Sequence, residues 1–361
     1  WNGVEWTRAS KEFGLDLNRN FPANWNPFEM FGMDGGDYPL SEPESRAVVD
    51  TFTDHPSIGC ALTMHTYTGA ILTQPYRPDS VLGDRDIDVM ELLADEMAED
   101  TDYQVLQVYP EFMYDEDNPV VGVWADTMTT VFGVPGYTVE FWDPLDYAGL
   151  EVEDPMDFIM DPDLETTREM LQVFAEADDN VVDWETHDHP QLGEVEIGGL
   201  EYLRTIRNPP VDELEGECKK ALKMAERARR ALPRAEASVE VESVGDDTNK
   251  VRIVLENQGF LPTSGLHRGE DLSVTPEVSV QIETDDDLEI DGARQQELDH
   301  MVGWGDLRVG RGRHPVYADL SAEGHRSFAE WTIRGEGTVE IEWLAGRAGR
   351  GAELVELFDE D

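Results

Sequence analysis

The chain has 361 residues, of which 79 are Asp or Glu and 27 are Lys or Arg, so its formal net charge is −52. Such an acidic surface repels a phosphate backbone and excludes nucleic acid as an expected partner, while the lack of any run of about eighteen apolar residues excludes an expected membrane-spanning helix. Hydrophobic residues make up 40% of the chain, and its length exceeds that of most single cores, so we expect two folded domains.

Helix-like and strand-like segments alternate through residues 1–180, which favours an α/β fold. The segment SEPESRAVVDTF, Ser41–Phe52, predicts a helix with Ser41 as its N-cap. The continuous apolar run Ile58–Met64 predicts a buried parallel strand that ends at His65. Apolar residues at helical spacing then predict a helix over 84–100.

A second buried strand is predicted at YTVEF, Tyr137–Phe141, and it carries Glu140 in its interior. A helix is expected over 164–174. The Trp-, Pro- and Gly-containing segment 183–210 is expected to be a connection, followed by a helix that Pro233 ends. The apolar face expected for this last helix consists of Leu214, Cys218, Ala221, Ala225, Ala228 and Leu232.

The two cysteines, Cys60 and Cys218, lie far apart in different contexts. A disulfide between them is therefore not expected. A free cysteine usually behaves as a small hydrophobic residue, so we expect both thiols to be buried.

Beyond about residue 235 the sequence changes to short β-branched runs separated by Gly and Asp, which is typical of a β-sandwich. The expected domains are residues 1–180, a connecting segment with a helix at 181–235, and an all-β domain at 236–361. The β-branched runs are 237–244, 251–255, 278–282 and 338–343.

Three polar residues stand out against their neighbours. His65 follows a predicted strand at the end where open α/β sheets bind ligands, so it is either a metal ligand or a structural histidine. Glu140 is an acid in a strand built for burial, which predicts a functional, metal-bound or arginine-paired carboxylate. Arg19, between Leu17 and Phe21, suits either bidentate carboxylate recognition or a surface ion pair.

Four segments, in their order along the chain, resemble those of the zinc metallocarboxypeptidase family of carboxypeptidase A. The resemblance implies an α/β fold with a mixed, mostly parallel sheet and helices on both faces. It also implies a Zn²⁺ cofactor and hydrolysis of C-terminal amino acids from peptides or proteins. The segments are GLDLNRNFP (Gly14–Pro22), YPLSEPESRAVVD (Tyr38–Asp50), MHTYTGAILTQPY (Met64–Tyr76) and YTVEFWD (Tyr137–Asp143).

The resemblance assigns roles to individual residues. His65 resembles the last of the three zinc ligands, and Glu140 resembles the general base that activates the zinc-bound water and passes its proton to the leaving amine. Asn18 and Arg19 resemble the pair that binds the terminal carboxylate of the substrate.

Further roles follow from the same resemblance. Tyr67 resembles a substrate-subsite tyrosine, and Tyr114 resembles the mobile tyrosine that closes over the bound carboxylate, with Tyr109 as the alternative. Arg8 is the candidate for the arginine that stabilises the oxyanion.

One part of the family pattern does not appear. The other two zinc ligands of the family form an HxxE pair well upstream of the NRNF segment, and here only 17 residues precede Asn18. We therefore expect the chain to be the remainder of a longer polypeptide and inactive as it stands. His267 and Glu270 have HxxE spacing in the β-rich part, which we interpret as chance, and His187 and His189 are expected to be structural.

Other interpretations stay open at this stage. The chain could be a non-catalytic relative that binds a peptide or carboxylate, or an amide hydrolase that removes acyl or glutamyl groups. Alternatively, the β-rich part could attach to a cell-surface polymer. The acid excess resembles that of proteins from salt-accumulating halophiles, and location, oligomeric state and terminal-residue preference stay open.

Overall fold

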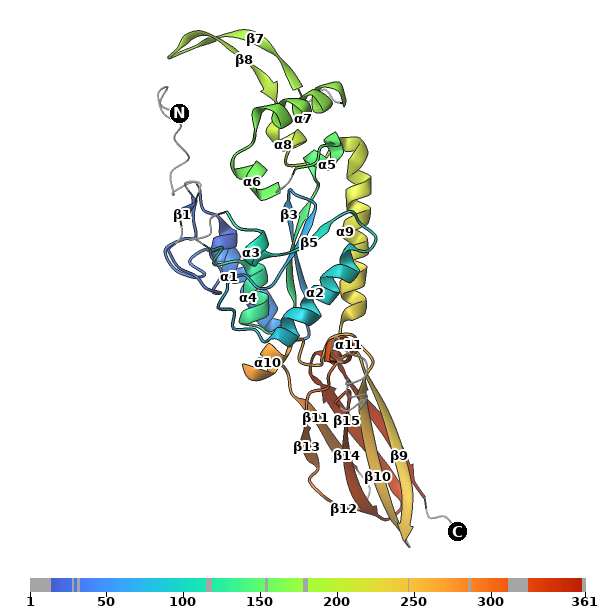
Figure 1. Ribbon diagram of the computed structural model, residues 1–361. Helices are drawn as coiled ribbons and strands as arrows, with labels where there is room; N and C mark the ends of the chain where they lie inside the picture. Colours follow the sequence, from blue (N-terminus) through green and yellow to red (C-terminus); the bar gives the residue numbers. More distant parts are fainter. Residues whose placement is uncertain are drawn as a thin grey trace.

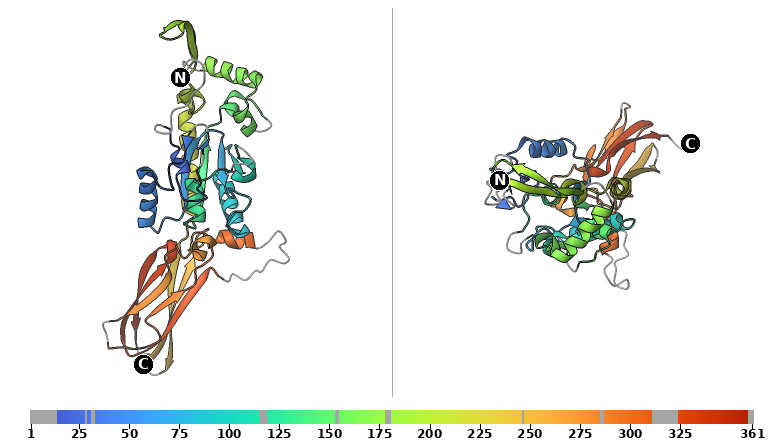
Figure 2. Two further views of the ribbon diagram at one scale, coloured as in Figure 1. Left: turned by 90° about the vertical axis from the view of Figure 1, so that its left-hand side faces the viewer. Right: turned by 90° about the horizontal axis from the view of Figure 1, so that it is seen from above.

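The computed structural model describes residues 14–27, 29–30, 33–114, 119–152, 155–177, 181–245, 247–284, 287–310 and 324–358. The molecule is elongated, with an α/β part in the middle, a β-sandwich at one end and a two-stranded hairpin at the other (Figures 1 and 2). Within these residues, no helix has the length and apolar character needed to cross a membrane.

The α/β part is built on one four-stranded sheet. Its strands lie in the order β3 (Ala61–Thr66), β6 (Gly136–Phe141), β4 (Ala70–Thr73) and β5 (Gln104–Gln107). The pairs β3–β6 and β4–β5 are parallel, whereas β4–β6 is antiparallel. The sheet is therefore mixed and mostly parallel, as predicted.

Helices cover both faces of this sheet. On one face Ile71, Tyr137 and Val139 pack against α2 (Asp84–Ala98) and α9 (Val211–Ala231). On the other face Ala70 and Leu72 pack with residues of α3 (Val108–Glu111) and α4 (Trp124–Thr130). Neighbouring residues of β4 thus point to opposite cores, which confirms the predicted fold class.

Smaller elements surround the sheet. Helix α1 (Pro43–Asp54) packs against α4, where the ring centroids of Phe52 and Trp124 lie 6.2 Å apart. The remaining elements of this part are η1 (Leu17–Arg19), β1 (Glu29–Met30), β2 (Met33–Asp34), α5 (Pro144–Ala148), α6 (Pro155–Met160), α7 (Leu164–Ala177), β7 (Val181–His189), β8 (Gly193–Leu200) and α8 (Tyr202–Thr205).

The sandwich consists of two four-stranded antiparallel sheets around one apolar core. Burial alternates strictly along β10, where Val251, Ile253 and Leu255 are fully buried between half-buried neighbours. One sheet has the order β12 (Glu289–Asp291), β14 (Arg326–Arg334), β10 (Thr248–Asn257), β9 (Ala235–Gly245). The other has the order β13 (Gln295–Leu298), β11 (Val278–Glu283), β15 (Gly337–Ala345), β16 (Arg350–Leu357), and α10 (His267–Asp271), α11 (Trp304–Gly310) and η2 (Gly346–Ala348) connect the strands.

The contact region between the sandwich and the α/β part, here called the sandwich interface, contains buried charged groups. Arg347 is 5% exposed. Its guanidinium donates hydrogen bonds to the carbonyl oxygens of Pro56 (2.5 Å), Ile58 (2.8 Å), Phe132 (3.1 Å) and Ser264 (3.1 Å). One arginine of the sandwich thus satisfies backbone carbonyls from both parts.

A second group of charges at the sandwich interface surrounds the start of α2. The fully buried Asp306 lies 2.8 Å from Arg85 Nε and 2.9 Å from His267 Nε2. Asp86 accepts hydrogen bonds from the backbone N–H groups of His267 (3.0 Å) and Arg268 (2.9 Å). The hydrogen bond to Asp306 raises the pKa of His267. Asp306 is therefore paired with Arg85 and His267, whereas the Asp86 carboxylate is satisfied by backbone N–H groups.

The start of α1 differs from the prediction. Glu42, rather than Ser41, is the N-cap residue, and no side chain caps the helix. The Ser41 hydroxyl accepts a hydrogen bond from Asn20 Nδ2 (2.9 Å) and donates one to Glu42 Oε1 (2.8 Å). A tertiary contact has therefore taken the oxygen that was expected to cap the helix.

Strand β3 differs as well. It begins at Ala61 rather than Ile58, continues past His65 to Thr66, and is half-exposed rather than buried. The reason is its position, because β3 is one of the two outer strands of the sheet within the described residues. The side chain of Met64 is accordingly 51% exposed.

The segment expected to be a connection contains the antiparallel hairpin β7–β8 and helix α8. The predicted apolar face of α9 is right only in its C-terminal part, where Ala228 is buried against α2 and Leu232 packs on the same core, whereas Cys218 is exposed. Met224 is buried there, whereas Leu214 is 49% exposed. Both cysteines are free, but Cys218 is exposed and Cys60 only half-buried, so the expectation of two buried thiols fails for Cys218.

Candidate active site

The sequence DLNRN folds into a short 3-10 turn, η1, that side chains fix at both ends. Asp16 Oδ1 accepts a hydrogen bond from Asn18 N (2.9 Å) as the N-cap. The fully buried Asn20 donates from Nδ2 to the carbonyl oxygen of Gly35 (2.6 Å). Because both ends are held, Asn18 and Arg19 are kept at the wall of a cavity.

Close packing around η1 requires glycine at two positions. A Cβ atom on Gly122, where φ is +64°, or on Gly35 would lie 2.3 Å from the carbonyl oxygen of Arg19. The approach of the Gly122 loop also brings Trp124 N to 2.9 Å from Asn18 Oδ1. With its oxygen engaged in this way, the amide of Asn18 directs Nδ2 towards β3.

His65 and Glu140 lie together on neighbouring parallel strands. They are register partners on β3 and β6, near the carboxyl ends of both strands. Asn18 Nδ2 lies 3.3 Å from His65 Nε2, and Thr63 Oγ1 lies 3.1 Å from the same nitrogen. The structure thus brings Asn18, His65 and Glu140, which are far apart in sequence, to one place.

Glu140 is a buried carboxyl group without a paired cation. It is 8% exposed, and no arginine or lysine nitrogen lies within 4.0 Å of it in the described part of the chain, so the expected alternative of a buried ion pair is wrong there. Burial raises the pKa of Glu140 to about 7, against weaker lowering effects of Arg207 and Arg19. A carboxyl group of this kind can take up and release a proton near neutral pH.

Burial also affects His65. It lowers the pKa of the imidazole, and the nearby positive charges of Arg19 and Arg207 act in the same direction, although Asp16 opposes them. The neutral imidazole is therefore favoured, which leaves a ring nitrogen able to accept a hydrogen bond or bind a metal ion.

These residues line a cavity of about 680 Å³. Its polar wall includes Arg19, Tyr67 and Tyr114, whereas Tyr109 is not among the lining residues. Burial raises the pKa of Tyr67 to about 12 and raises the pKa of Tyr114 as well. The apolar wall includes Leu72, Val108, Phe112, Val120, Val123, Met156 and Ile159, and Leu15 and Leu17 line the cavity as well.

The structure adds two cavity residues that the sequence analysis missed, Tyr202 and Arg207. Both belong to the segment that was expected to be a connection. Arg207 Cζ lies 5.7 Å from the centroid of the Tyr67 ring. The available signal was weak, because a single arginine in a segment without periodicity has no motif, although basic residues are scarce in this chain.

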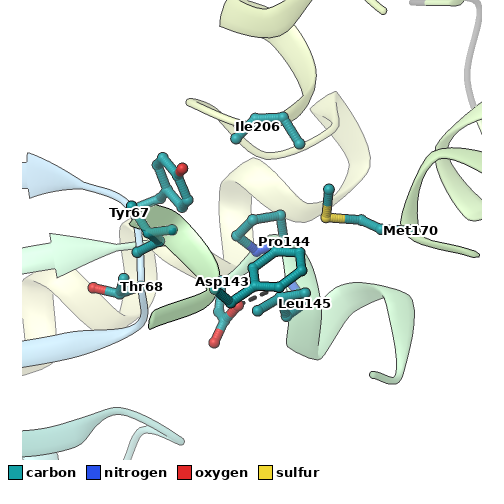
Figure 3. Close-up of a pocket in the computed structure, with 9 residues that line it drawn as sticks. Tyr67, Thr68, Asp143, Pro144, Leu145, Met170 and Ile206 are labelled. Carbon is teal, nitrogen blue, oxygen red and sulfur yellow. Dashed lines mark hydrogen bonds between the residues drawn. The ribbon is translucent and has the colours of Figure 1, made fainter. Parts of the chain in front are cut away.

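A smaller pocket of about 40 Å³ lies behind Tyr67 and is lined mainly by apolar side chains. Figure 3 shows Tyr67, Ile206 and Met170 around it, with Asp143 and Leu145 at the start of α5. This volume can hold a water molecule but not a peptide side chain. The pocket is therefore a small packing gap beside Ile206, the residue before Arg207, and is not a separate ligand site.

The described residues do not complete a zinc site. Catalytic zinc takes three protein ligands and a water molecule. No three His, Cys, Asp or Glu side chains are grouped for a metal ion in the part of the chain that the structure describes. His65 offers one imidazole nitrogen, so the described residues fit one ligand of such a site and not the whole.

The other predicted residues lie elsewhere. Arg8 is outside the described residues. His267, which has HxxE spacing with Glu270, is bonded to Asp306 at the sandwich interface. His187 and His189 lie on the β7–β8 hairpin.

Comparison with known families bears on both parts of the chain. Residues 2–155 match the family model described as zinc carboxypeptidase, and residues 236–356 match a model described as a domain of unknown function. The first match contains all four segments of the sequence-based resemblance. It confirms that residues 2–155 are similar to zinc carboxypeptidases of the carboxypeptidase A-like family.

Individual relatives match shorter stretches. Carboxypeptidase O of Bos taurus is 41% identical over 71 residues, which cover 18% of this chain and 18% of the bovine protein. The chain thus spans less than a fifth of the length of this curated relative.

Among solved structures, thrombin-activatable fibrinolysis inhibitor is 21% identical, with a TM-score of 0.32, and the match covers 48% of this chain and 44% of that one. The bovine form in complex with tick carboxypeptidase inhibitor has the same identity and TM-score, over 48% of this chain and 60% of that one. These scores are too low to establish a shared fold.

Proposed function

We propose that this protein, whose residues 2–155 match the zinc carboxypeptidases, acts on the C-terminal ends of peptides. The observation that carries the proposal is the assembly of Asn18, Arg19, His65 and Glu140 around one cavity. The family match supports the reaction class, hydrolysis of the terminal peptide bond.

Arg19 and Asn18 are proposed to bind the terminal carboxylate. The Arg19 side chain is 12% exposed and lies at the cavity wall, where a guanidinium can bind a carboxylate with two hydrogen bonds. The Nδ2 group of Asn18 lies between η1 and His65 and can donate a further hydrogen bond. Binding of a terminal carboxylate here would limit the reaction to chain ends.

Glu140 is proposed to move the proton of the reaction. Its carboxylate would accept the proton of the attacking water and then donate it to the amine that leaves, which its pKa of about 7 permits at neutral pH. In the family a zinc ion polarises the scissile carbonyl and acidifies the water. Two ligands in addition to His65 are needed for that ion.

The cavity also indicates which terminal side chain fits. Its apolar wall would favour a large apolar residue such as Phe or Leu, because burial of such a side chain contributes about 1.5–3 kcal/mol. Tyr114, whose ring contacts that of Phe112 in the apolar wall, is proposed to contact the terminal residue, and Tyr67 to contact the residue before it.

The first test compares a peptide ending in Phe with a free carboxylate against the same peptide with a C-terminal amide. We expect the free acid to bind roughly tenfold to a hundredfold more tightly, and Arg19→Gln to remove this preference. Arg46→Gln, on the exposed face of α1, is the matched control and should keep it. Equal binding of acid and amide by the unaltered protein would refute the proposal.

A second candidate function is binding without catalysis. It is favoured by the observation that the described residues supply one imidazole for zinc and that its Nε2 contacts Asn18. The two candidates differ in zinc binding and turnover. The peptidase would be supported by stoichiometric zinc binding that His65→Ala abolishes, together with release of amino acids that Glu140→Gln abolishes. A protein that neither binds zinc nor releases amino acids would support the binding function.

A further inference from the structure

Arg207 brings a second guanidinium to the cavity from a segment outside the match to the zinc carboxypeptidases. It follows α8, whereas the family match ends at residue 155. Arg19 comes from η1, so the two arginines reach the cavity from separate segments. The resemblance therefore assigned no role to Arg207.

The backbone around Arg207 is anchored to the strand that carries Glu140. Arg207 N donates a hydrogen bond to Tyr202 O (3.1 Å), which continues the turn of α8. Trp142, directly after β6, donates from Nε1 to the carbonyl oxygen of Thr205 (3.2 Å). Both Trp142 and Thr205 are buried. The backbone that leads into Arg207 is therefore held beside the end of β6.

No carboxylate of the described residues lies within 4.0 Å of the Arg207 guanidinium, although the chain carries 79 acidic residues. Arg204, one turn earlier, contrasts with it, because it pairs with Glu201 at 3.4 Å. Arg19 also has an acidic neighbour, Asp16, at 3.8 Å. A half-exposed guanidinium that faces a cavity without a paired acid is available to an anionic group of a ligand.

The position of Arg207 indicates which part of a peptide it would meet. Its guanidinium lies over the ring of Tyr67, two residues beyond His65, whereas Arg19 neighbours Asn18. If Arg19 binds the terminal carboxylate and the scissile bond lies at His65 and Glu140, the chain beyond that bond runs towards Tyr67. Arg207 would then face the residue that precedes the C-terminal one.

We propose that Arg207 selects peptides whose penultimate residue is Asp or Glu, by pairing with its side-chain carboxylate. This inference rests on the proposed function, because it takes Arg19 as the binder of the terminal carboxylate. A net charge of −52 repels acidic peptides in general. A local guanidinium is thus needed for an acidic side chain to be accepted in the cavity.

The test measures binding by calorimetry, on the full chain in the presence of a chelator, so that no turnover is required. The ligands are N-acetyl-Glu-Phe, N-acetyl-Gln-Phe and the C-terminal amide of N-acetyl-Gln-Phe. We expect the Glu peptide to bind roughly fivefold to thirtyfold more tightly than the Gln peptide. Arg207→Gln should bring the ratio close to one while the preference for acid over amide is kept.

Two controls complete the design. Arg204→Gln, on the exposed side of α8, should keep the Glu-over-Gln ratio. Arg207→Lys keeps the charge but not the planar fork, and should keep part of the ratio, which provides a readout if the glutamine variant does not fold.

The outcomes separate this inference from the proposed function. The role of Arg207 is overturned if the Glu-over-Gln ratio is one, or if Arg207→Gln leaves that ratio unchanged. The proposed function is kept in either case, provided that the protein prefers acid over amide and that this preference depends on Arg19. The role of Arg207 is also overturned if Arg207→Gln weakens the binding of the Glu and Gln peptides equally, because the contact would then be with the backbone that they share. No preference for acid over amide overturns both.

Discussion

The cavity and the sandwich interface differ in whether their charged side chains have partners in the protein. At the interface Arg347 donates to four carbonyl oxygens and Asp306 pairs with Arg85 and His267. In the cavity Glu140 and Arg207 have no ion-pair partner among the described residues. Removal of one partner from a satisfied buried group is strongly destabilising, whereas a desolvated carboxyl group without a partner itself reduces stability and is typical of ligand sites.

The largest effect is expected from loss of the Arg347 guanidinium. Arg347→Ala would leave buried carbonyl oxygens of both parts without a donor, and we expect a loss of about 3–5 kcal/mol in the free energy of unfolding. Urea unfolding of the full chain measures this. Arg334→Ala is the matched control, because Arg334 is 65% exposed and its partner Glu289 is 75% exposed, so it should change stability by less than about 1 kcal/mol. Similar losses for the two variants would show that the Arg347 contacts do not stabilise the interface.

A somewhat smaller loss is expected when the Asp306 charge is removed. Asp306→Asn would leave Arg85 and His267 without their buried anion, and we expect a loss of about 2–3 kcal/mol. Glu289→Gln, which alters an exposed ion pair, is the control. If Asp306→Asn is as stable as the unaltered protein, the contrast between interface and cavity disappears.

In the cavity, removal of a charge is expected to raise the free energy of unfolding rather than lower it. Glu140 has its pKa raised from 4.5 to about 7, so its contribution to stability is present below pH 4.5 and is lost as the pH rises through 7. Glu140→Gln should therefore be more stable than the unaltered protein at pH 8, by about 3 kcal/mol, with little difference near pH 4.5.

Unfolding of metal-free protein across this pH range measures the difference. Glu185→Gln, at an exposed position of β7, should show no such pH dependence. A Glu140→Gln variant that is less stable at pH 8 would mean that the carboxylate is paired in solution.

The smallest effect concerns His267, which faces Asp306, Asp86 and Arg85. The pKa of His267 is raised above 6.5, so its pairing contributes fully below pH 6.5 and is lost as the pH rises through the folded-state value. We expect a shallow fall in stability above pH 6.5 that His267→Gln removes. An unchanged slope in that variant would assign the fall to another group.

Regular elements were predictable where one physical rule decided them. The helical stripe through Ile87, Met90 and Leu93 predicted α2, which the structure has at Asp84–Ala98. The β-branched runs after residue 235 predicted strands that form the sandwich. In both cases apolar periodicity and burial agree, so local sequence is sufficient.

Predictions failed where a tertiary contact outweighed local preference. Asn20 takes the Ser41 hydroxyl that would otherwise cap α1. The apolar run before His65 looked like a buried strand, yet β3 is an outer strand of the described sheet, and local sequence does not determine strand order. The buried residues of α9 are those that contact α2, and the sequence of α9 alone does not specify which residues these are.

The same reasons explain which residues of the candidate site were predicted from the sequence and which were missed. His65, Glu140, Asn18 and Arg19 were found because motif residues keep their spacing, and the structure brings them together. Arg207 was missed because its place in the cavity depends on the anchoring of α8 at Trp142, a contact between residues 63 positions apart.

The central claim, that the cavity binds a peptide C-terminus between two arginines, is tested most directly by a crystal structure with N-acetyl-Glu-Phe bound. The account predicts the terminal carboxylate within hydrogen-bond distance of Arg19 and the Glu side chain beside Arg207. A peptide bound in the reverse direction, or with its terminal carboxylate away from Arg19, would contradict it.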